Sequence, residues 1–255
     1  MVEDSYRIHS PRRDEWLGNL SDVEISAYND WKNFRCPVAP ISGTTVTMAQ
    51  PCWNNSQLHS WQMNLPQWVE NAYELLDEDR EWYLNRAAGY LYYKPGTGEN
   101  FSAATVTASK LETLVSGVNV HNVQFNGLTF SYATWLRPNS TEGYADVQSG
   151  FCIIGAGNTN FDATRPYWAK TPGNVTFTAS KAIRFERNTF THLGAVAVNF
   201  EGGSQNNMII GNLFQDISSS AVQLGQINDA NEINEANKNK DNTVSNNYIT
   251  QIATE

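Results

Sequence analysis

Three side chains in the second half of the chain have the types and spacing that acid–base chemistry needs: Glu201, Asp216 and His192. Glu201 follows an apolar run over 195–200 and precedes Gly202-Gly203, so we expect it at the end of a strand beside a permissive turn. Two carboxylates held roughly 5 to 9.5 Å apart can cleave a glycosidic bond. The three residues are therefore our candidates for catalysis, although Glu201 has the alternative of an ordinary solvated turn acid.

His192 and Asp216 are 24 residues apart, which is also the interval of a repeat in this part of the chain. If they occupy equivalent places in neighbouring repeats, the two side chains stack and form a charge-assisted hydrogen bond. A structural corner pair is the alternative to a functional one.

Aromatic residues gather between 132 and 175, a stretch that is also rich in Pro, Gly and Asn. Aromatic planes suit the C–H faces of pyranose rings, so a substrate-binding role is one interpretation. Packing of this stretch against the rest of the protein is the other. The candidates for substrate binding are Trp135, Tyr144, Tyr167 and Trp168.

These candidates lie in a region that repeats. Four short apolar segments recur after residue 111, at 123–130, 183–190, 208–214 and 244–249, and the last three share an Asn two places before the closing apolar residue. These are Asn188, Asn212 and Asn247, at intervals of 24 and 35 residues. One turn of a β-solenoid takes about 24 residues, and the longer interval implies an outward loop, which the polar run 228–241 supplies. We expect the three asparagines to adopt left-handed conformations and to hydrogen-bond to one another in a structural stack.

We therefore predict an all-β protein of two parts. Residues 1–110 form a β-rich N-terminal module that contains a short helix over 65–79 and a hairpin over 81–95, with its turn near Ala88-Gly89. Residues 111–255 form the rungs of a right-handed parallel β-helix, with insertions at 132–175 and 228–241. We expect this piece to be truncated at its C-terminus.

The bulk composition excludes some classes of function. A formal charge of −9 leaves no basic surface for phosphates, which disfavours nucleic-acid binding and adhesion to anionic membranes. No apolar run is long enough to span a bilayer, and the first residues do not form a signal peptide. We predict no metal site and no cofactor; calcium could serve a pectate-type enzyme, but no compact ligand motif indicates it.

The three cysteines allow one disulfide. Cys36 and Cys52 flank a predicted hairpin and are the plausible pair in an oxidising compartment, with Cys152 left over. Three buried, unbridged cysteines are the alternative.

Several segments resemble the large secreted bacterial proteins that contain right-handed parallel β-helix repeats. The resemblance covers most of the chain and is carried by residues 35–38, 71–76, 81–89, 91–95 and 127–130. Among enzymes, the chain is similar to the β-helical glycoside hydrolases of families 141 and 120, which have a pectin lyase-like fold and act on plant cell-wall glycans. The catalytic acids of those families do not map residue by residue onto this sequence.

The resemblance implies an extracellular, monomeric, carbohydrate-active protein that contacts a polysaccharide or oligosaccharide and forms part of a glycoside hydrolase. A non-catalytic glycan-binding or adhesin solenoid is a second hypothesis, and a polysaccharide lyase is a third. A close pair of acids favours the first hypothesis, an aromatic strip without such a pair the second, and a base beside a charge-neutralising cation the third.

Overall fold

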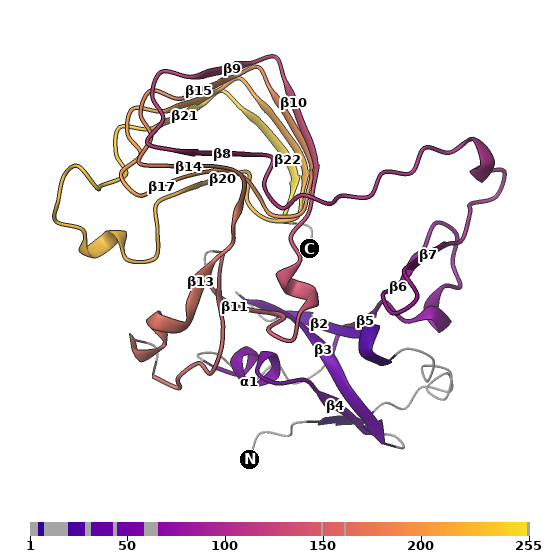
Figure 1. The fold of residues 1–255 in the computed structure, drawn as a ribbon. Coiled ribbons are helices and arrows are strands. Elements are labelled where there is room, and N and C mark those ends of the chain that lie inside the picture. The colour runs from indigo at the N-terminus through magenta and orange to yellow at the C-terminus, as the bar shows by residue number, and fades with distance from the viewer. Residues whose placement is uncertain are drawn as a thin grey trace. The chain divides into compact units, whose positions relative to one another are not determined.

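The computed structural model describes residues 5–7, 20–28, 32–42, 45–58, 66–148, 150–160 and 162–253. The protein is all-β with little helix, and its sheets are of mixed topology. The chain divides into two compact units. Unit 1 contains residues 1–106 and 137–168, and unit 2 contains residues 107–136 and 169–255 (Figure 1).

Unit 1 is built on an antiparallel sheet and a hairpin. The sheet runs in the order β1-β4-β3-β11-β12-β13, with β2 paired to β3 and β5 paired to β2. Its strands are β1 (Ser5–Arg7), β2 (Glu24–Tyr28), β3 (Asn33–Ser42), β4 (Thr45–Met48), β5 (Trp68–Glu70), β11 (Tyr144–Gln148), β12 (Phe151–Ile153) and β13 (Trp168–Lys170). Helix α1 (Cys52–Ser56) follows β4. Among the described residues, the short 3-10 helices are η2 (Leu20–Asp22), η3 (Tyr73–Leu75), η4 (Phe101–Ala103), η5 (Arg137–Asn139), η6 (Asp162–Tyr167) and η7 (Asp229–Asn231).

The predicted hairpin and disulfide are both present in unit 1. Strands β6 (Trp82–Asn85) and β7 (Tyr90–Tyr93) pair antiparallel, with Gly89 at φ +70° in the turn, which confirms the hairpin. A disulfide joins Cys36 and Cys52, whose Cα atoms are 5.6 Å apart, and Cys152 is a buried free thiol. The alternative of three unbridged cysteines is therefore wrong.

The helix predicted over 65–79 is wrong within the residues that the structure describes. Trp68–Glu70 is strand β5, which pairs with β2, and Tyr73–Leu75 is a single 3-10 turn. The apolar spacing that suggested a helical stripe arises because Val69 and Ala72 pack on the core of unit 1 from two different elements. A tertiary sheet contact has overridden a short local periodicity.

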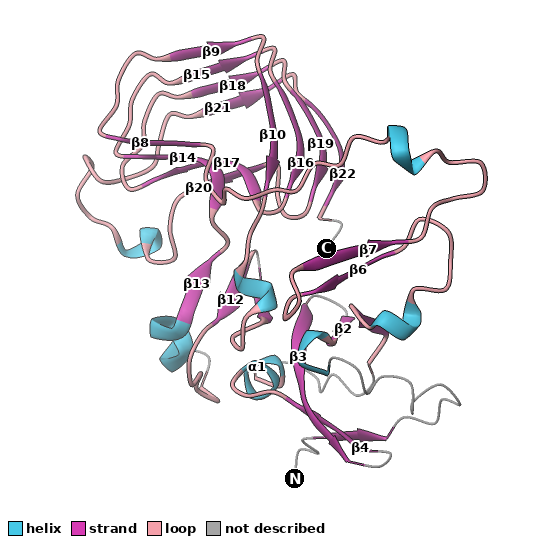
Figure 2. Ribbon diagram, turned by 45° about the vertical axis from the view of Figure 1, so that its right-hand side comes forward, coloured by secondary structure: helices cyan, strands magenta, loops and turns pink. Residues whose placement is uncertain are grey.

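Unit 2 contains three parallel four-stranded sheets, and four successive stretches of chain each contribute one strand to each sheet (Figure 2). The first sheet contains β8 (Val115–Val118), β14 (Gly173–Thr178), β17 (Val196–Glu201) and β20 (Val222–Leu224). The second contains β9 (Gln124–Asn126), β15 (Arg184–Glu186), β18 (Met208–Ile210) and β21 (Thr243–Ser245). The third contains β10 (Thr129–Ala133), β16 (Thr189–Leu193), β19 (Leu213–Ile217) and β22 (Tyr248–Ile252).

The predicted intervals are confirmed by the pairing register. Phe190 pairs with Phe214 across 24 residues, and Phe214 pairs with Ile249 across 35 residues. Polar loop 228–241 accounts for the longer interval, because no strand lies between β20 and β21. The stretch 132–175 that we predicted as an insertion carries β11 and β12, which belong to the sheet of unit 1. The predicted boundary near residue 110 between an N-terminal module and the β-helix rungs stays a prediction.

Phenylalanine side chains stack between neighbouring strands in the core of unit 2. Ring centroids are 4.8 Å apart for Phe130 and Phe190 and 4.7 Å apart for Phe190 and Phe214, and the ring planes are tilted by 10° and 6°. Phe125 and Phe185 stack in the same way at 4.7 Å. These distances equal the spacing of hydrogen-bonded strands, so a residue type that recurs at one register position forms a continuous column.

The predicted asparagine stack is also confirmed. The Nδ2 atom of Asn188 donates to Oδ1 of Asn212 at 3.0 Å, and Nδ2 of Asn212 donates to Oδ1 of Asn247 at 3.0 Å. The left-handed conformation, however, falls one residue earlier than predicted, at Arg187, Gly211 and Asn246. Each Asn thereby points inward, where its Nδ2 atom also donates to a backbone carbonyl oxygen of the preceding repeat. These acceptors are Phe125, Phe185 and Ile209.

Among the described residues, no helix is both long enough and apolar enough to cross a membrane.

Candidate functional site

Glu201 lies where the sequence predicts it, at the last residue of β17 and beside Gly202 and Gly203, which have φ of +56° and +84°. Val198 and Phe200 of the same strand point into the core and are fully buried, so the alternation of the strand turns Asn199 and Glu201 outward. The outer face of the first parallel sheet therefore presents a carboxylate at a strand end.

Three side chains from three segments hold the Glu201 carboxylate. Lys170 Nζ lies 3.2 Å from Oε2, Asn199 Nδ2 donates to Oε2 at 3.0 Å, and Thr178 Oγ1 donates to Oε1 at 3.4 Å. Glu201 keeps 23% of its side chain exposed, which leaves it accessible to a ligand. We call these four residues the Glu201 cluster.

Lys170 is the cation of the Glu201 cluster, and only 12% of its side chain is exposed. Besides Glu201, its ammonium group donates to Asn199 Oδ1 at 2.5 Å and to the carbonyl oxygen of Gly225. An ammonium group has three protons, so all of them have acceptors. Burial lowers the pKa of Lys170, and the charges of Glu201 and Asp229 partly oppose this effect.

Asp229 supplies a second carboxylate that acts on the same ammonium group. It begins η7 in the polar loop, where its Oδ2 accepts hydrogen bonds from the backbone of Gln226 at 2.9 Å and from Nδ2 of Asn239 at 2.7 Å. Glu201 thus contacts Lys170 directly, whereas Asp229 affects the pKa of Lys170 through its charge.

A row of polar side chains crosses the first parallel sheet next to this cluster. Thr176, Asn199 and Gln223 are register partners on adjacent strands, and Asn199 Nδ2 donates to Thr176 Oγ1 at 2.9 Å. Oε1 of Gln223 is a buried acceptor without a hydrogen-bond partner in the described part of the chain. A hydroxyl donor that reached it would satisfy it.

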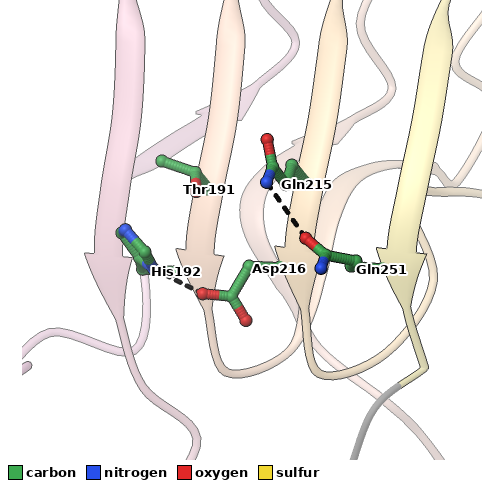
Figure 3. A pocket seen from close by; sticks show the side chains of 5 residues that line it. All are labelled: Thr191, His192, Gln215, Asp216 and Gln251. Carbon is green, nitrogen blue, oxygen red and sulfur yellow. Dashed lines mark hydrogen bonds and ion pairs between the residues drawn. The ribbon is translucent and has the colours of Figure 1, made fainter.

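His192 and Asp216 meet on the third parallel sheet, as the sequence predicts. They occupy equivalent places on β16 and β19, and Nδ1 of His192 contacts Oδ2 of Asp216 (Figure 3). Together with Thr191, Gln215 and Gln251 they line a shallow depression of about 510 Å³. About half of each of the two side chains is exposed, at 49% and 52%.

Glu201 and Asp216 do not come together as a pair of acids. They lie on different sheets. Asp216 is on β19 beside His192 of β16, whereas Glu201 is the last residue of β17, the strand that follows β16 in the chain. Five residue steps of extended strand span about 17 Å. That distance is too large for the paired carboxylates of a glycosidase. The sequence could not reveal this, because the spacing of two residues along a chain does not say which sheet each one joins.

The four aromatic candidates are divided between the two units. Trp135 belongs to unit 2, whereas Tyr144, Tyr167 and Trp168 belong to unit 1. Trp168 stacks on Phe151 at 6.1 Å and carries the Arg165 guanidinium 5.6 Å above its ring, so it is packed within unit 1. Tyr167 lines a second shallow depression of about 510 Å³ in unit 1 with Arg137, Glu142 and Pro166. Their role in substrate binding stays a prediction.

Sequence reasoning missed Lys170 and Asn199. A signal existed for Asn199, because it is two residues before Glu201 on a strand and must share its face. No local signal exists for Lys170, which lies 31 residues before Glu201. Among the described residues, no group of three or more His, Cys, Asp or Glu side chains could hold a metal ion.

Comparison with known proteins gives a likeness of fold. The sequence matches no protein-family model and no curated protein sequence. A solved structure described as a glycoside hydrolase superposes on 92% of this chain with a TM-score of 0.76 and 24% sequence identity. The match covers 45% of that protein, so this chain spans less than half of its length. The likeness establishes a shared fold.

Proposed function

We propose that this chain is part of an extracellular glycoside hydrolase that acts on plant or microbial polysaccharide. The observation that carries the proposal is the Glu201 cluster, an outward carboxylate held by three side chains on a parallel sheet. The fold likeness to a glycoside hydrolase is consistent with this proposal but is not evidence of activity.

The scaffold of the proposal is a right-handed parallel β-helix. Three parallel sheets that each receive one strand from every successive stretch of chain support this scaffold. The right-handed sense follows from the strong preference of parallel strand connections for that hand. An elongated face with neighbouring strands about 4.8 Å apart suits an extended polymer.

The proposed chemistry uses two carboxylates. Glu201 is the first. We propose Asp229 as the second, because its carboxylate lies beside Gly225, whose carbonyl oxygen accepts a hydrogen bond from the same Lys170 ammonium group. In glycoside hydrolysis one acid protonates the leaving oxygen, while the other carboxylate activates water or attacks the sugar. Lys170 orients the Glu201 carboxylate through its 3.2 Å contact.

The same geometry disfavours a polysaccharide lyase. A lyase needs a cation that is free to neutralise the carboxylate of a uronate. Among the described ion pairs, Lys170 is the cation that contacts Glu201, and its three protons already have acceptors in Asn199, Glu201 and Gly225.

Hydrolysis by the full-length parent protein, measured beside the 255-residue chain, tests the proposal. Release of reducing sugar from a panel of polysaccharides and aryl glycosides is the readout. We expect Glu201→Gln to lower kcat by about 10² to 10⁴-fold, the usual range for loss of a general acid or base. Glu186→Gln is the matched control, because Glu186 also ends an outward strand and is paired with Arg184 at 2.8 Å on another sheet.

Wild-type activity in Glu201→Gln would remove Glu201 from the mechanism. If neither the full-length parent nor the 255-residue chain releases sugar, but both retain glycan binding, the chain is a binding solenoid instead.

A further inference from the structure

The third parallel sheet carries a second polar surface, away from the Glu201 cluster. Each of its strands contains one residue with a left-handed conformation: Tyr132, His192, Asp216 and Gln251, with φ between +48° and +61°. The pairing register passes over this residue; Ser131 pairs with Thr191 and Ala133 with Leu193. Every strand therefore turns two consecutive side chains outward before it returns to the core.

The result is a double row of side chains across four strands. The outer row contains Tyr132, His192, Asp216 and Gln251, and the inner row contains Ser131, Thr191, Gln215 and Thr250. We call the two rows together the polar strip; Figure 3 shows five of its residues around the depression. All eight residues belong to unit 2.

The outer row keeps functional side chains at positions that favour glycine. A left-handed conformation is strained for Tyr, His and Gln, and glycine relieves that strain. At the corner before this sheet, the corresponding left-handed residues are Gly127, Arg187, Gly211 and Asn246, so glycine occupies two of those four positions and none of the four in the outer row.

The chemistry of the polar strip suits a hydroxyl-rich ligand. Gln215 Nε2 donates to Gln251 Oε1 at 3.0 Å, which leaves further amide donors and acceptors of both residues facing outward (Figure 3). Tyr132 stacks on His192 with ring centroids 5.0 Å apart and remains 45% exposed. Amide, hydroxyl and aromatic groups together are the contacts that sugars use.

Charge and spacing select the kind of glycan. Asp216 places a carboxylate in the polar strip, its neighbour His192 is already in contact with that carboxylate, and the chain carries a net charge of −9. A polyanion would be repelled. Neighbouring strands lie about 4.8 Å apart, close to the repeat of an extended sugar chain, so the four strands accommodate about three to four sugar residues.

We propose that the polar strip is a second carbohydrate-binding surface, which takes an uncharged, extended polysaccharide that runs across the strands at one sugar per strand. The inference rests on the proposed function in one respect, that the natural ligand is a polysaccharide. The strip holds substrate on a face of unit 2 other than the one that carries Glu201.

Affinity electrophoresis with soluble xylan, mixed-linkage β-glucan and galactomannan tests the inference, with polygalacturonate as the charged comparison. The strip variant is Tyr132→Asn with His192→Asn, because Asn tolerates the left-handed conformation and removes both rings. Arg187→Asn is the matched control: Arg187 is also left-handed and exposed, but it lies outside the strip. Gln215→Ala, which changes a residue of ordinary strand conformation, is the second strip variant if the double variant does not fold.

We expect the dissociation constant for at least one neutral polysaccharide to rise about tenfold in the strip variants, the loss that corresponds to one aromatic contact. Arg187→Asn should bind like the wild type. Unchanged affinity in both strip variants, absence of binding to every neutral polysaccharide, or equal binding of polygalacturonate would each overturn the inference.

Glu201→Gln separates this inference from the proposed function. We expect it to lower kcat of the parent protein by about 10² to 10⁴-fold and to leave polysaccharide binding intact. Loss of polysaccharide binding in Glu201→Gln would overturn the inference, because the polysaccharide that the wild type binds would then lie at the Glu201 cluster. If binding depends on the strip but no hydrolysis occurs, the proposed function fails and the inference stands.

Discussion

A buried pair of charges in unit 1 shows how environment sets the charge of single residues. Lys32 is 4% exposed and donates to the carbonyl oxygens of Ser56 at 2.5 Å and Leu58 at 2.8 Å. Burial lowers its pKa to about 8, which the charge of Asp146 partly opposes. Burial also raises the pKa of Asp146 to about 6, against the backbone N–H donors of Asn33 and Val147 and the Lys32 charge.

These pKa values predict the pH dependence of stability. An acid whose folded pKa exceeds its unfolded value of 3.8 binds its proton more tightly when folded, so its contribution to stability falls as pH rises from about 4 to about 6. At about 1.4 kcal/mol per pKa unit, the fall amounts to about 2 to 3 kcal/mol. We expect Asp146→Asn to remove this fall in urea unfolding measured at several pH values.

Asp79→Asn is the control, because Asp79 is exposed in the same unit. The same fall in wild type and Asp146→Asn would show that other groups produce the pH dependence.

At the scale of elements, the asparagine stack fixes the register of the parallel sheets. Asn212 is 2% exposed and makes bonds in both directions: its Oδ1 accepts from the backbone and the amide of Asn188, and its Nδ2 donates to Asn247 and to the carbonyl of Phe185. A second stack of the same kind, which the sequence reading missed, joins Asn207 to Asn242. Its two members are 35 residues apart, the same interval as Asn212 and Asn247.

We expect Asn212→Ala to lower the free energy of unfolding by about 3 kcal/mol, because it leaves buried backbone and amide groups of neighbouring strands without partners. Chemical denaturation followed by far-UV circular dichroism measures the loss. Asn126→Ala is the control, because Asn126 is exposed at the end of β9 in the same unit. Among the described hydrogen bonds, its side chain makes one, with the exposed Arg187. A loss below about 1 kcal/mol in Asn212→Ala would mean that the stack contributes little.

At the scale of the whole molecule, the two units are held by different means. Unit 1 contains the Cys36–Cys52 disulfide and the free thiol of Cys152, whereas the sequence of unit 2 contains no cysteine. Unit 2 has its stacked phenylalanines and its asparagine stack instead. The bridge closes a short loop across a sequence separation of 16 residues.

We expect reduction to destabilise unit 1 by about 3 kcal/mol, the value for a loop of about 15 residues, and to leave the intrinsic stability of unit 2 unchanged. Tryptophan fluorescence reports mainly on unit 1, because seven of the eight tryptophans belong to it. Denaturation curves with and without a thiol reductant therefore give the measurement. A variant with Cys36→Ala and Cys52→Ala should show no further response to reductant, and an identical curve for reduced and oxidised wild type would contradict the prediction.

The sequence by itself determined the features that repeat along the chain. The intervals of 24 and 35 residues, the stack of Asn188, Asn212 and Asn247, the contact of His192 with Asp216 and the strand-end position of Glu201 all follow from periodicity and turn chemistry. These features were accessible because parallel strands one turn apart place equivalent residues side by side.

Only the tertiary structure decided which non-equivalent residues meet. It brought Lys170 into contact with Glu201, assigned Glu201 and Asp216 to separate sheets, and made a strand of residues 68–70 where a helix was predicted. It also moved the left-handed residue from Asn188 to Arg187. The reason is physical: such contacts depend on the path of loops and on side-chain partners distant in the chain, and neither leaves a local pattern in the sequence.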